Sequence, residues 1–177
     1  MNCPLCGCDN LEGADACSRC GADLRDGEAL AATSDLEREL LHCSLGDLAA
    51  DGYIEVSPEC SVAETVRRWH QQGCHCAIVV ESGRIVGIFT ERDLLMKLAH
   101  RFAEAADAPV RDYMTPDPVT LNCDDPAAFA LNRMMVGGYR HIPIQRDGAL
   151  AGMVSVRDIL AYLARQFEDV IAADVPA

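Results

Sequence analysis

The sequence predicts a mixed α/β fold in which two tandem β-α-β-β-α repeats follow a small cysteine-rich segment. From Asp47 onward, apolar helical stretches alternate with short β-branched runs, the pattern of an α/β protein. The chain also aligns with itself without a gap when it is shifted by 65 positions, so that Gly73 meets Gly138 and Gly87 meets Gly152 (138 − 73 = 152 − 87 = 65). A fixed internal period indicates a duplicated supersecondary unit.

Composition divides the chain into four parts. Residues 1–24 hold five of the ten cysteines, and residues 25–46 are acidic and rich in alanine and leucine. The first repeat is expected over 47–104 and the second over 105–170. Within residues 25–46, the sequence Ser34-Asp35-Leu36-Glu37 forms a capping box, which predicts a short helix through Leu40, Leu41 and His42.

The first repeat is expected to begin with an extended segment at Tyr53–Val56. A capping box from Ser61 to Glu64 then starts a helix that ends near Gly73. Two strands follow on either side of a Ser-Gly turn, and a second helix begins after them. The expected bounds are Ala77–Val80 and Arg84–Phe89 for the strands and Thr90 for the start of the helix.

The second repeat has the same order. Its extended segment is Pro118–Leu121, and Asp125-Pro126 predicts an N-cap followed by proline at the first helical position. The helix is expected to end near Gly138. An Asp-Gly turn between two apolar runs then predicts a β-hairpin, and the last helix follows it. These elements are expected at Ile142–Ile144, Ala149–Val154 and, for the helix start, Ser155.

Charge and targeting patterns exclude several classes of function. The chain carries 15 basic and 28 acidic residues, a formal net charge of −13 at pH 7. An acidic surface repels phosphate backbones, which argues against broad nucleic-acid binding. There is no signal-peptide pattern and no apolar run of roughly 20 residues, so we expect a cytoplasmic protein without a membrane span. Thiols stay reduced there, which favours metal ligands or buried thiols over disulfides.

Two C-x2-C-G knuckles lie in residues 1–24. Cys3 and Cys6 form the first, and Cys17 and Cys20 form the second. Four thiolates suit tetrahedral zinc, and the metal supplies folding energy that so short a segment cannot gain from burial. The segment resembles the zinc-ribbon family. The alternatives are a reduced, unstructured tail and a redox pair.

The remaining cysteines are interpreted as core or surface thiols. Cys74-His75-Cys76 has the composition of a second metal site, but on a strand the two cysteines would share a face while the histidine pointed away. Buried thiols are common in such cores. The same interpretation applies to Cys8, Cys43, Cys60 and Cys123.

The repeats resemble the CBS (cystathionine-beta-synthase) domain family over about residues 45–167. Four segments carry the resemblance. They are Gly87–Asp93 and Gly152–Asp158, the segment that leads into the second repeat at Asp112–Pro116, and the predicted strand Arg140–Ile144. It implies that the two repeats pack through their sheets into a pseudo-twofold Bateman module. It further implies two clefts that bind adenosine-containing ligands, and a flat homodimer.

A strand-to-helix corner recurs in both repeats at the proposed ligand sites. Thr90 and Ser155 stand where a helix offers free N–H groups and a partial positive charge, both of which attract phosphate. Asp93 and Asp158 follow three residues later, and the resemblance implies that such a carboxylate accepts the hydroxyls of a ribose. The same spacing is also an ordinary capping arrangement that needs no ligand.

The two sites are not equal. Thr120 and Arg140 of the second repeat correspond to Glu55 and His75 of the first (120 − 55 = 140 − 75 = 65). Arg140 is the best phosphate partner, because a guanidinium is always charged and forks onto oxyanions. Its alternative is a surface ion pair. His141 is a further candidate ligand contact, and its alternative is a histidine packed at a strand edge.

The function expected from these features is regulatory. We expect an adenine-nucleotide sensor for AMP, ADP, ATP or S-adenosylmethionine that acts on a separate effector protein. No nucleophile elbow, P-loop or paired acid and base points to an enzyme. The alternatives are a zinc-ribbon transcriptional regulator associated with nucleic acid and a ligand-free interaction scaffold. Arg19 is the sole basic residue in 1–24, which argues against the first alternative.

Overall fold

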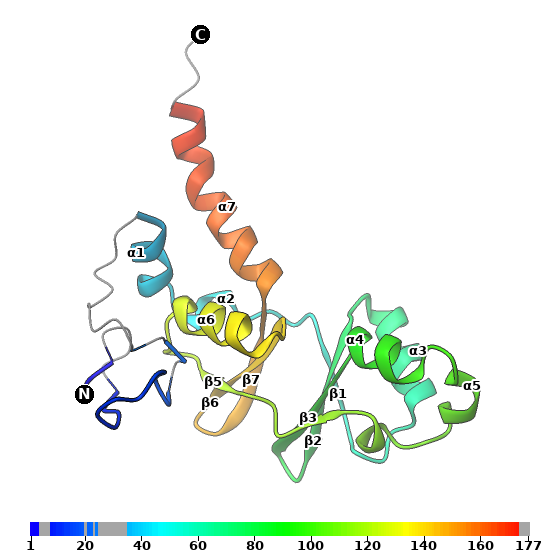
Figure 1. Ribbon diagram of the computed structural model, residues 1–177. Helices are drawn as coiled ribbons and strands as arrows, with labels where there is room; N and C mark the ends of the chain where they lie inside the picture. The colour runs from blue at the N-terminus through cyan, green and yellow to red at the C-terminus, as the bar shows by residue number, and fades with distance from the viewer. Residues whose placement is uncertain (4–7, 20, 23, 25–34, 174–177) are drawn as a thin grey trace. The chain divides into compact units, whose positions relative to one another are not determined.

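The structure is a computed structural model that describes residues 1–3, 8–19, 21–22, 24 and 35–173 (Figure 1). The chain divides into two compact units that do not follow chain order. Unit 1 consists of Met1–Ala49, Leu121–Ile142 and Val154–Ala177. Unit 2 consists of Ala50–Thr120 and Pro143–Met153.

Three strands of the first repeat and β4, from the beginning of the segment assigned to the second repeat, form a four-stranded sheet in the order β1-β2-β3-β4. The first pair is parallel and the other two pairs are antiparallel. Ser82 and Gly83 join β2 to β3 with φ of 50° and 77°, and two successive positive φ values match the right-handed twist of a hairpin. The strands are β1 (Ile54–Val56), β2 (Cys76–Glu81), β3 (Arg84–Thr90) and β4 (Thr115–Pro116).

Helix α3 (Val62–Gln72) covers one face of this sheet, and its limits follow from its sequence. The Ser61 side chain accepts a hydrogen bond from the N–H of Glu64, as the capping pattern predicts. Gly73 ends the helix in the left-handed region, at φ 65°. Both predicted helix limits are therefore confirmed.

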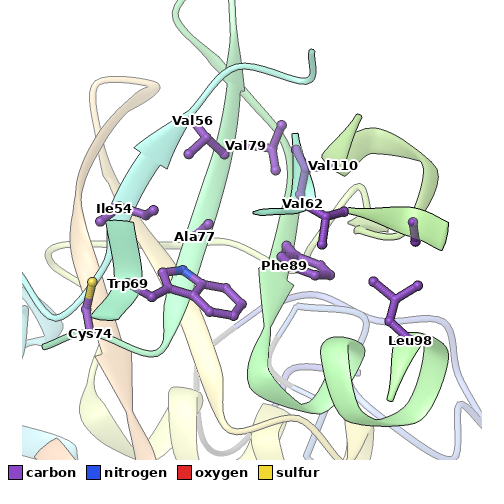
Figure 2. Close-up of a cluster of buried hydrophobic side chains, with 11 residues drawn as sticks. Ile54, Val56, Val62, Trp69, Cys74, Ala77, Val79, Phe89, Leu98 and Val110 are labelled. Carbon is purple, nitrogen blue, oxygen red and sulfur yellow. The ribbon is translucent and has the colours of Figure 1, made fainter. Parts of the chain in front are cut away.

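The core of the first repeat lies between α3 and the sheet. The Trp69 ring stacks on Phe89 (Figure 2), and the ring centroids are 5.2 Å apart. Both side chains are buried, within a cluster that includes Ile54, Val56, Val62, Ala77, Val79, Leu98 and Val110. The opposite face of β2 and β3 presents a second cluster, in which Cys76, Ile78 and Ile88 pack with Met153 from β7.

The second helical region of the first repeat is divided into short pieces. A single turn, α4 (Glu91–Asp93), leads into a π-helical turn, η1 (Leu94–Leu98). Two short elements then lead toward β4: α5 (Phe102–Ala105) and the 3-10 turn η2 (Val110–Asp112).

The second repeat follows the same order with a longer last helix. Its sheet has the order β5-β6-β7. Asp147 and Gly148 join β6 to β7 with φ of 53° and 80°, which confirms the predicted Asp-Gly hairpin. The elements are β5 (Leu121–Asn122), α6 (Ala127–Gly137), β6 (His141–Arg146), β7 (Ala149–Ser155) and α7 (Val156–Ala173).

The predicted cap of α6 is wrong in detail. Pro126 occupies the N-cap position and makes no side-chain cap, whereas we expected Asp125 there. The Asp125 carboxylate instead accepts hydrogen bonds from the backbone N–H of Asn122 and from the Arg19 guanidinium. The Asp125 carboxylate is therefore bonded to these two donors and does not cap α6.

The internal duplication also holds for contacts between distant segments. The N–H of Leu45 donates to the carbonyl of Asp125 at 2.9 Å, and the N–H of Val110 donates to the carbonyl of Cys60 at 2.8 Å. These bonds correspond under the shift of 65 positions (110 − 45 = 125 − 60 = 65). The bridge between Ser44 and Pro126 corresponds in the same way to the bridge between Ser61 and Pro109. The pairing of Ala50 with Met153 likewise corresponds to that of Thr115 with Ile88.

The segment before the repeats contains α1 (Asp35–His42) and α2 (Leu45–Leu48). The predicted helix through Leu40, Leu41 and His42 is confirmed, while its capping residue Ser34 lies outside the described residues. Among the residues that the structure covers, no helix is both long enough and apolar enough to span a bilayer.

Candidate functional site

Two strand-to-helix corners have nearly the same local geometry. At the first corner, the Oδ2 atom of Asp93 accepts from the N–H of Thr90 at 3.0 Å and from its hydroxyl at 2.8 Å. At the second corner, the Oδ2 atom of Asp158 accepts from the N–H of Ser155 at 2.7 Å and from its hydroxyl at 2.6 Å. The capping arrangement that the sequence offered as an alternative is therefore formed at both corners, and the predicted contact with a ligand stays a prediction.

The two carboxylates differ in what holds their second oxygen. The Oδ1 atom of Asp93 lies 2.8 Å from the Nζ atom of Lys97 and accepts from the Thr115 hydroxyl at 3.2 Å. Lys97 is itself held, because its ammonium donates to the carbonyl of Tyr113 at 2.6 Å. Both oxygens of the first carboxylate therefore have partners within unit 2.

The Asp158 carboxylate keeps one oxygen available. Within the described part of the chain, its Oδ1 atom has no hydrogen-bond or ion-pair partner. The position that corresponds to Lys97 is Tyr162 (162 − 97 = 65), whose hydroxyl donates to the Oε2 atom of Glu39 at 3.1 Å. Burial and that hydrogen bond raise the pKa of Tyr162 to about 12, so it remains a neutral donor. Among the residues that the structure describes, no cation pairs with Asp158 as Lys97 does with Asp93.

The surroundings of the two corners also differ in charge. At the first corner, the Nδ1 atom of His75 lies 2.8 Å from a carboxylate oxygen of Glu91, which directly follows Thr90. At the second corner, Arg140 and Val156 occupy the corresponding positions (140 − 75 = 156 − 91 = 65). The backbone bond between the two positions is kept, at 3.3 Å in the first repeat and 3.1 Å in the second. The second repeat therefore has an arginine in place of His75 and an apolar valine in place of Glu91.

The other predicted site residues are placed as follows. Arg140 is exposed, and the described residues give its guanidinium no carboxylate partner, so the surface ion pair considered from the sequence is not formed among them. His141 is half-buried at the start of β6. Thr120 is in unit 2, directly before β5 in the sequence. Its hydroxyl donates to the Oε1 atom of Gln145 at 3.4 Å. The structure thus brings Ser155 and Asp158 together, with the backbone of Arg140 beside them.

Two of the four proposed metal ligands lie within the described residues. Cys3 and Cys17 are each 2% exposed, although residues 1–24 offer little other core. Asn10 joins their segments, because its Nδ2 atom donates to the carbonyl of Cys8 at 2.8 Å and approaches the sulfur of Cys17 at 3.5 Å. Cys6 and Cys20 lie outside the described residues. No group of three or more possible metal ligands occurs among the residues that were placed.

Cys74, His75 and Cys76 do not converge. Cys74 precedes β2 and packs with Trp69, whereas Cys76 lies in β2 and packs with Ile78. The expectation that the two thiols share a face is wrong, because Cys74 is outside the strand. Burial raises the pKa of both thiols, as expected for inert core cysteines.

Sequence reasoning missed the residues that make the two corners different. Lys97 and Glu91 were not singled out, although each differs in chemistry from its counterpart in the second repeat. Thr115 was not singled out either, although its counterpart is Ala50, which has no hydroxyl (115 − 50 = 65). A comparison of the two copies position by position, beyond the shared motif, contains this signal.

Comparisons with known proteins agree with this geometry. A family model described as "CBS domain" matches residues 45–100 and 110–165, well over half of the chain. An uncharacterized 17.7 kDa protein of Acidianus ambivalens is 37% identical over 110 residues, an alignment that covers 61% of this chain and 65% of that protein. The chain thus spans slightly less than two thirds of this relative.

Solved structures share the fold. A CBS-domain containing protein from Agrobacterium tumefaciens superposes with a TM-score of 0.62 and 27% identity, covering 68% of this chain and 99% of that one. A CBS domain protein from Pyrobaculum aerophilum, solved in complex with AMP, superposes with a TM-score of 0.60 and 23% identity. That superposition covers 70% of this chain and 99% of the other.

The different use of the two carboxylates leads to a prediction about stability. Asp93→Asn removes the ion pair with Lys97 in addition to weakening a cap, whereas Asp158→Asn weakens only a cap. A cap contributes about 0.5–2 kcal/mol, and a partly exposed ion pair adds about 0.2–1 kcal/mol. We expect Asp93→Asn to lower the melting temperature more, as measured by calorimetry on the full chain. Lys97→Met is the control, and its effect should vanish in the Asp93→Asn background. Equal shifts for the two aspartate variants would contradict the assignment.

Proposed function

The chain belongs to the CBS domain family, and on this basis we propose that it is a regulatory module that senses an adenine nucleotide at its second strand-to-helix corner. The observation that carries the proposal is the open Oδ1 atom of Asp158 beside Ser155, with the guanidinium of Arg140 unpaired among the described residues. A carboxylate oxygen accepts hydrogen bonds from ribose hydroxyls, and a guanidinium binds phosphate.

The first corner is the poorer candidate for a nucleotide. A ribose there would compete with Lys97 and Thr115 for the Oδ1 atom of Asp93. A phosphate would meet the carboxylate of Glu91 at the helix start, and Glu55 adds a second negative charge where the second repeat has Thr120. Like charges oppose the binding of an anion. We therefore assign the ligand to the second corner, with His141 as a contact to the base.

The ligand class rests on relatives with the same fold. The Pyrobaculum protein is a CBS domain protein complexed with AMP, and this chain shares its fold. AMP is accordingly the first ligand to test, with ADP, ATP and S-adenosylmethionine as the other members of the class. We propose no catalytic activity, because the corner contains a cap, a free carboxylate oxygen and a cation but no paired acid and base.

We propose that the sensor acts on a separate cytoplasmic effector protein. Nucleic acid is a weaker candidate, because Arg19, the sole basic residue in 1–24, is bound to the Asp125 carboxylate at 3.0 Å. We also propose a homodimer, since exposed apolar side chains remain on the helical elements of both repeats. These side chains are Leu95, Met96, Met135, Val136 and Leu160.

The amino-terminal segment is proposed to hold one zinc ion through Cys3, Cys6, Cys17 and Cys20. Two of these thiols are buried, and an amide donor from Asn10 approaches one sulfur, as it would for a thiolate bound to metal. Zinc held by four thiolates links the two halves of a segment that is too short for its own core. We assign the metal a structural role, because four protein ligands leave no open coordination position.

The nucleotide assignment predicts unequal effects of matched substitutions. Asp158→Asn should weaken AMP binding about 10- to 150-fold, since a hydrogen bond to a charged group contributes about 1.5–3 kcal/mol. Asp93→Asn, its counterpart in the first repeat, should bind AMP nearly as well as the wild type. Arg140→Ala should weaken AMP more than adenosine, because it removes the phosphate partner. Calorimetric titration measures all three, and circular dichroism checks that each variant is folded.

The opposite pattern, with AMP lost in Asp93→Asn and kept in Asp158→Asn, would move the ligand to the first corner. If the wild type binds no adenosine compound, the sensor proposal fails and the ligand-free scaffold becomes the better account.

The metal assignment predicts about one zinc ion per chain in purified protein, measured by elemental analysis. The double variant Cys3→Ser with Cys20→Ser should lose the metal, while the far-ultraviolet circular dichroism of the repeats persists. Cys8→Ser is the matched control and should keep the zinc, because Cys8 lies outside both knuckles. Full zinc content in the double variant would rule out the four-thiolate site.

A further inference from the structure

The second cysteine knuckle is docked on the start of helix α6, within unit 1. The guanidinium of Arg19 lies 3.0 Å from the Oδ1 atom of Asp125. In the opposite direction, Arg133 of α6 donates to the carbonyl of Ser18 at 2.9 Å and also to the carbonyl of Arg19. Each side of the contact thus provides a cation and an acceptor.

The acceptor on the repeat side is well buried and firmly held. The Asp125 side chain is 8% exposed, and its Oδ2 atom accepts from the N–H of Asn122 at 2.8 Å. Its backbone carbonyl accepts from the N–H of Leu45. Among the described residues, Arg19 is the one cation that pairs with this carboxylate. A buried carboxylate that loses its cation is strongly disfavoured, so undocking would disturb the segment from Asn122 to Asp125.

The first repeat shows that the fold itself does not require these groups. The counterpart of Asp125 is Cys60, whose sulfur accepts from the Thr65 hydroxyl (125 − 60 = 65). The counterpart of Arg133 is Arg68, which donates to the carbonyl of Glu55 inside its own repeat at 2.9 Å. The knuckle has no equivalent there. The pairing of Asp125 and Arg133 with the knuckle is therefore particular to the second copy.

The acceptors on the knuckle side belong to the loop that is proposed to bind zinc. The carbonyls of Ser18 and Arg19 lie between Cys17 and Cys20 in the sequence, so a metal held by both thiols would restrict the positions of these carbonyls. Arg133 orients its guanidinium toward this loop even though its Nε atom is buried without a partner. The geometry of the contact therefore depends on the conformation of the loop.

We propose that the start of α6 is a docking surface for the second cysteine knuckle, and that this contact couples metal occupancy to the repeat that binds nucleotide. The proposal rests on the zinc site proposed above. Loss of the metal would release the loop, remove the acceptors of Arg133 and separate Arg19 from Asp125. The segment from Asn122 to Asp125 lies in the same unit as Ser155 and Asp158. Coupling between sites is reciprocal, so nucleotide binding would in turn favour the metal.

Hydrogen exchange on the full chain tests this coupling without any nucleotide. In the zinc-bound protein, the N–H of Asn122 is bonded to the Asp125 carboxylate and should exchange slowly. Removal of zinc with a chelator should speed its exchange at least several-fold. Arg133→Met should show fast exchange while zinc is still bound, at an unchanged one ion per chain. Arg67→Met is the control and should leave Asn122 protected. Arg67 is an exposed arginine of α3 that pairs with Glu64 and, within the described part of the chain, with no other carboxylate.

The possible outcomes distinguish a failure of the coupling from a failure of the zinc site or of AMP binding. Equal exchange of Asn122 with and without zinc, or full protection in Arg133→Met, overturns the coupling even if the zinc site is correct. Wild-type protein that holds no zinc overturns the metal site, and the coupling with it. Failure to bind AMP leaves the exchange result unchanged, because the readout needs no nucleotide.

Discussion

The reciprocal hydrogen bonds between Ser155 and Asp158 are the interaction on which the account depends. A strand that turns directly into a helix leaves backbone N–H groups without partners, and here a carboxylate and a hydroxyl satisfy them. The cap uses one oxygen of the carboxylate and fixes the direction of the other. A group held in this way can serve the fold and a ligand together, so capping and binding are not exclusive alternatives at this corner.

Duplication followed by divergence explains why one fold contains two unequal corners. Both repeats keep the cap, the hairpin turn and the backbone bond that joins the corner to the preceding strand. They differ in side chains that the fold does not need. Lys97 neutralises Asp93 in the first repeat, whereas Tyr162 stands in its place in the second and turns to Glu39. The first corner is internally satisfied, whereas the Oδ1 atom of Asp158 and the guanidinium of Arg140 have no partner among the described residues.

Local signals in the sequence predicted most of the fold. The Ser61 cap, the Gly73 terminus and the Asp147-Gly148 turn each depend on neighbouring residues and were confirmed. The errors arose where distant residues compete for a group. Asp125 was expected to cap α6, but Arg19, which lies far away in the sequence, takes its carboxylate together with the N–H of Asn122.

The residues of the candidate site could be predicted from the sequence, but the difference between the two corners could not. The repeated motif identified Thr90, Asp93, Ser155 and Asp158, and the structure pairs them as the spacing implies. Which oxygen remains open depends on side chains four or more residues away, such as Thr115, and on whether each one turns toward the carboxylate. Such choices follow from packing, and the motif alone does not contain them.

The most direct test of the central claim is a nuclear magnetic resonance titration of the isotope-labelled, zinc-bound chain with AMP. Backbone amide shifts report which corner the ligand occupies. The account predicts saturable changes at Arg140, His141 and Ser155–Asp158, while Thr90–Asp93 stays unchanged. Changes confined to Thr90–Asp93, or none at either corner, would contradict it.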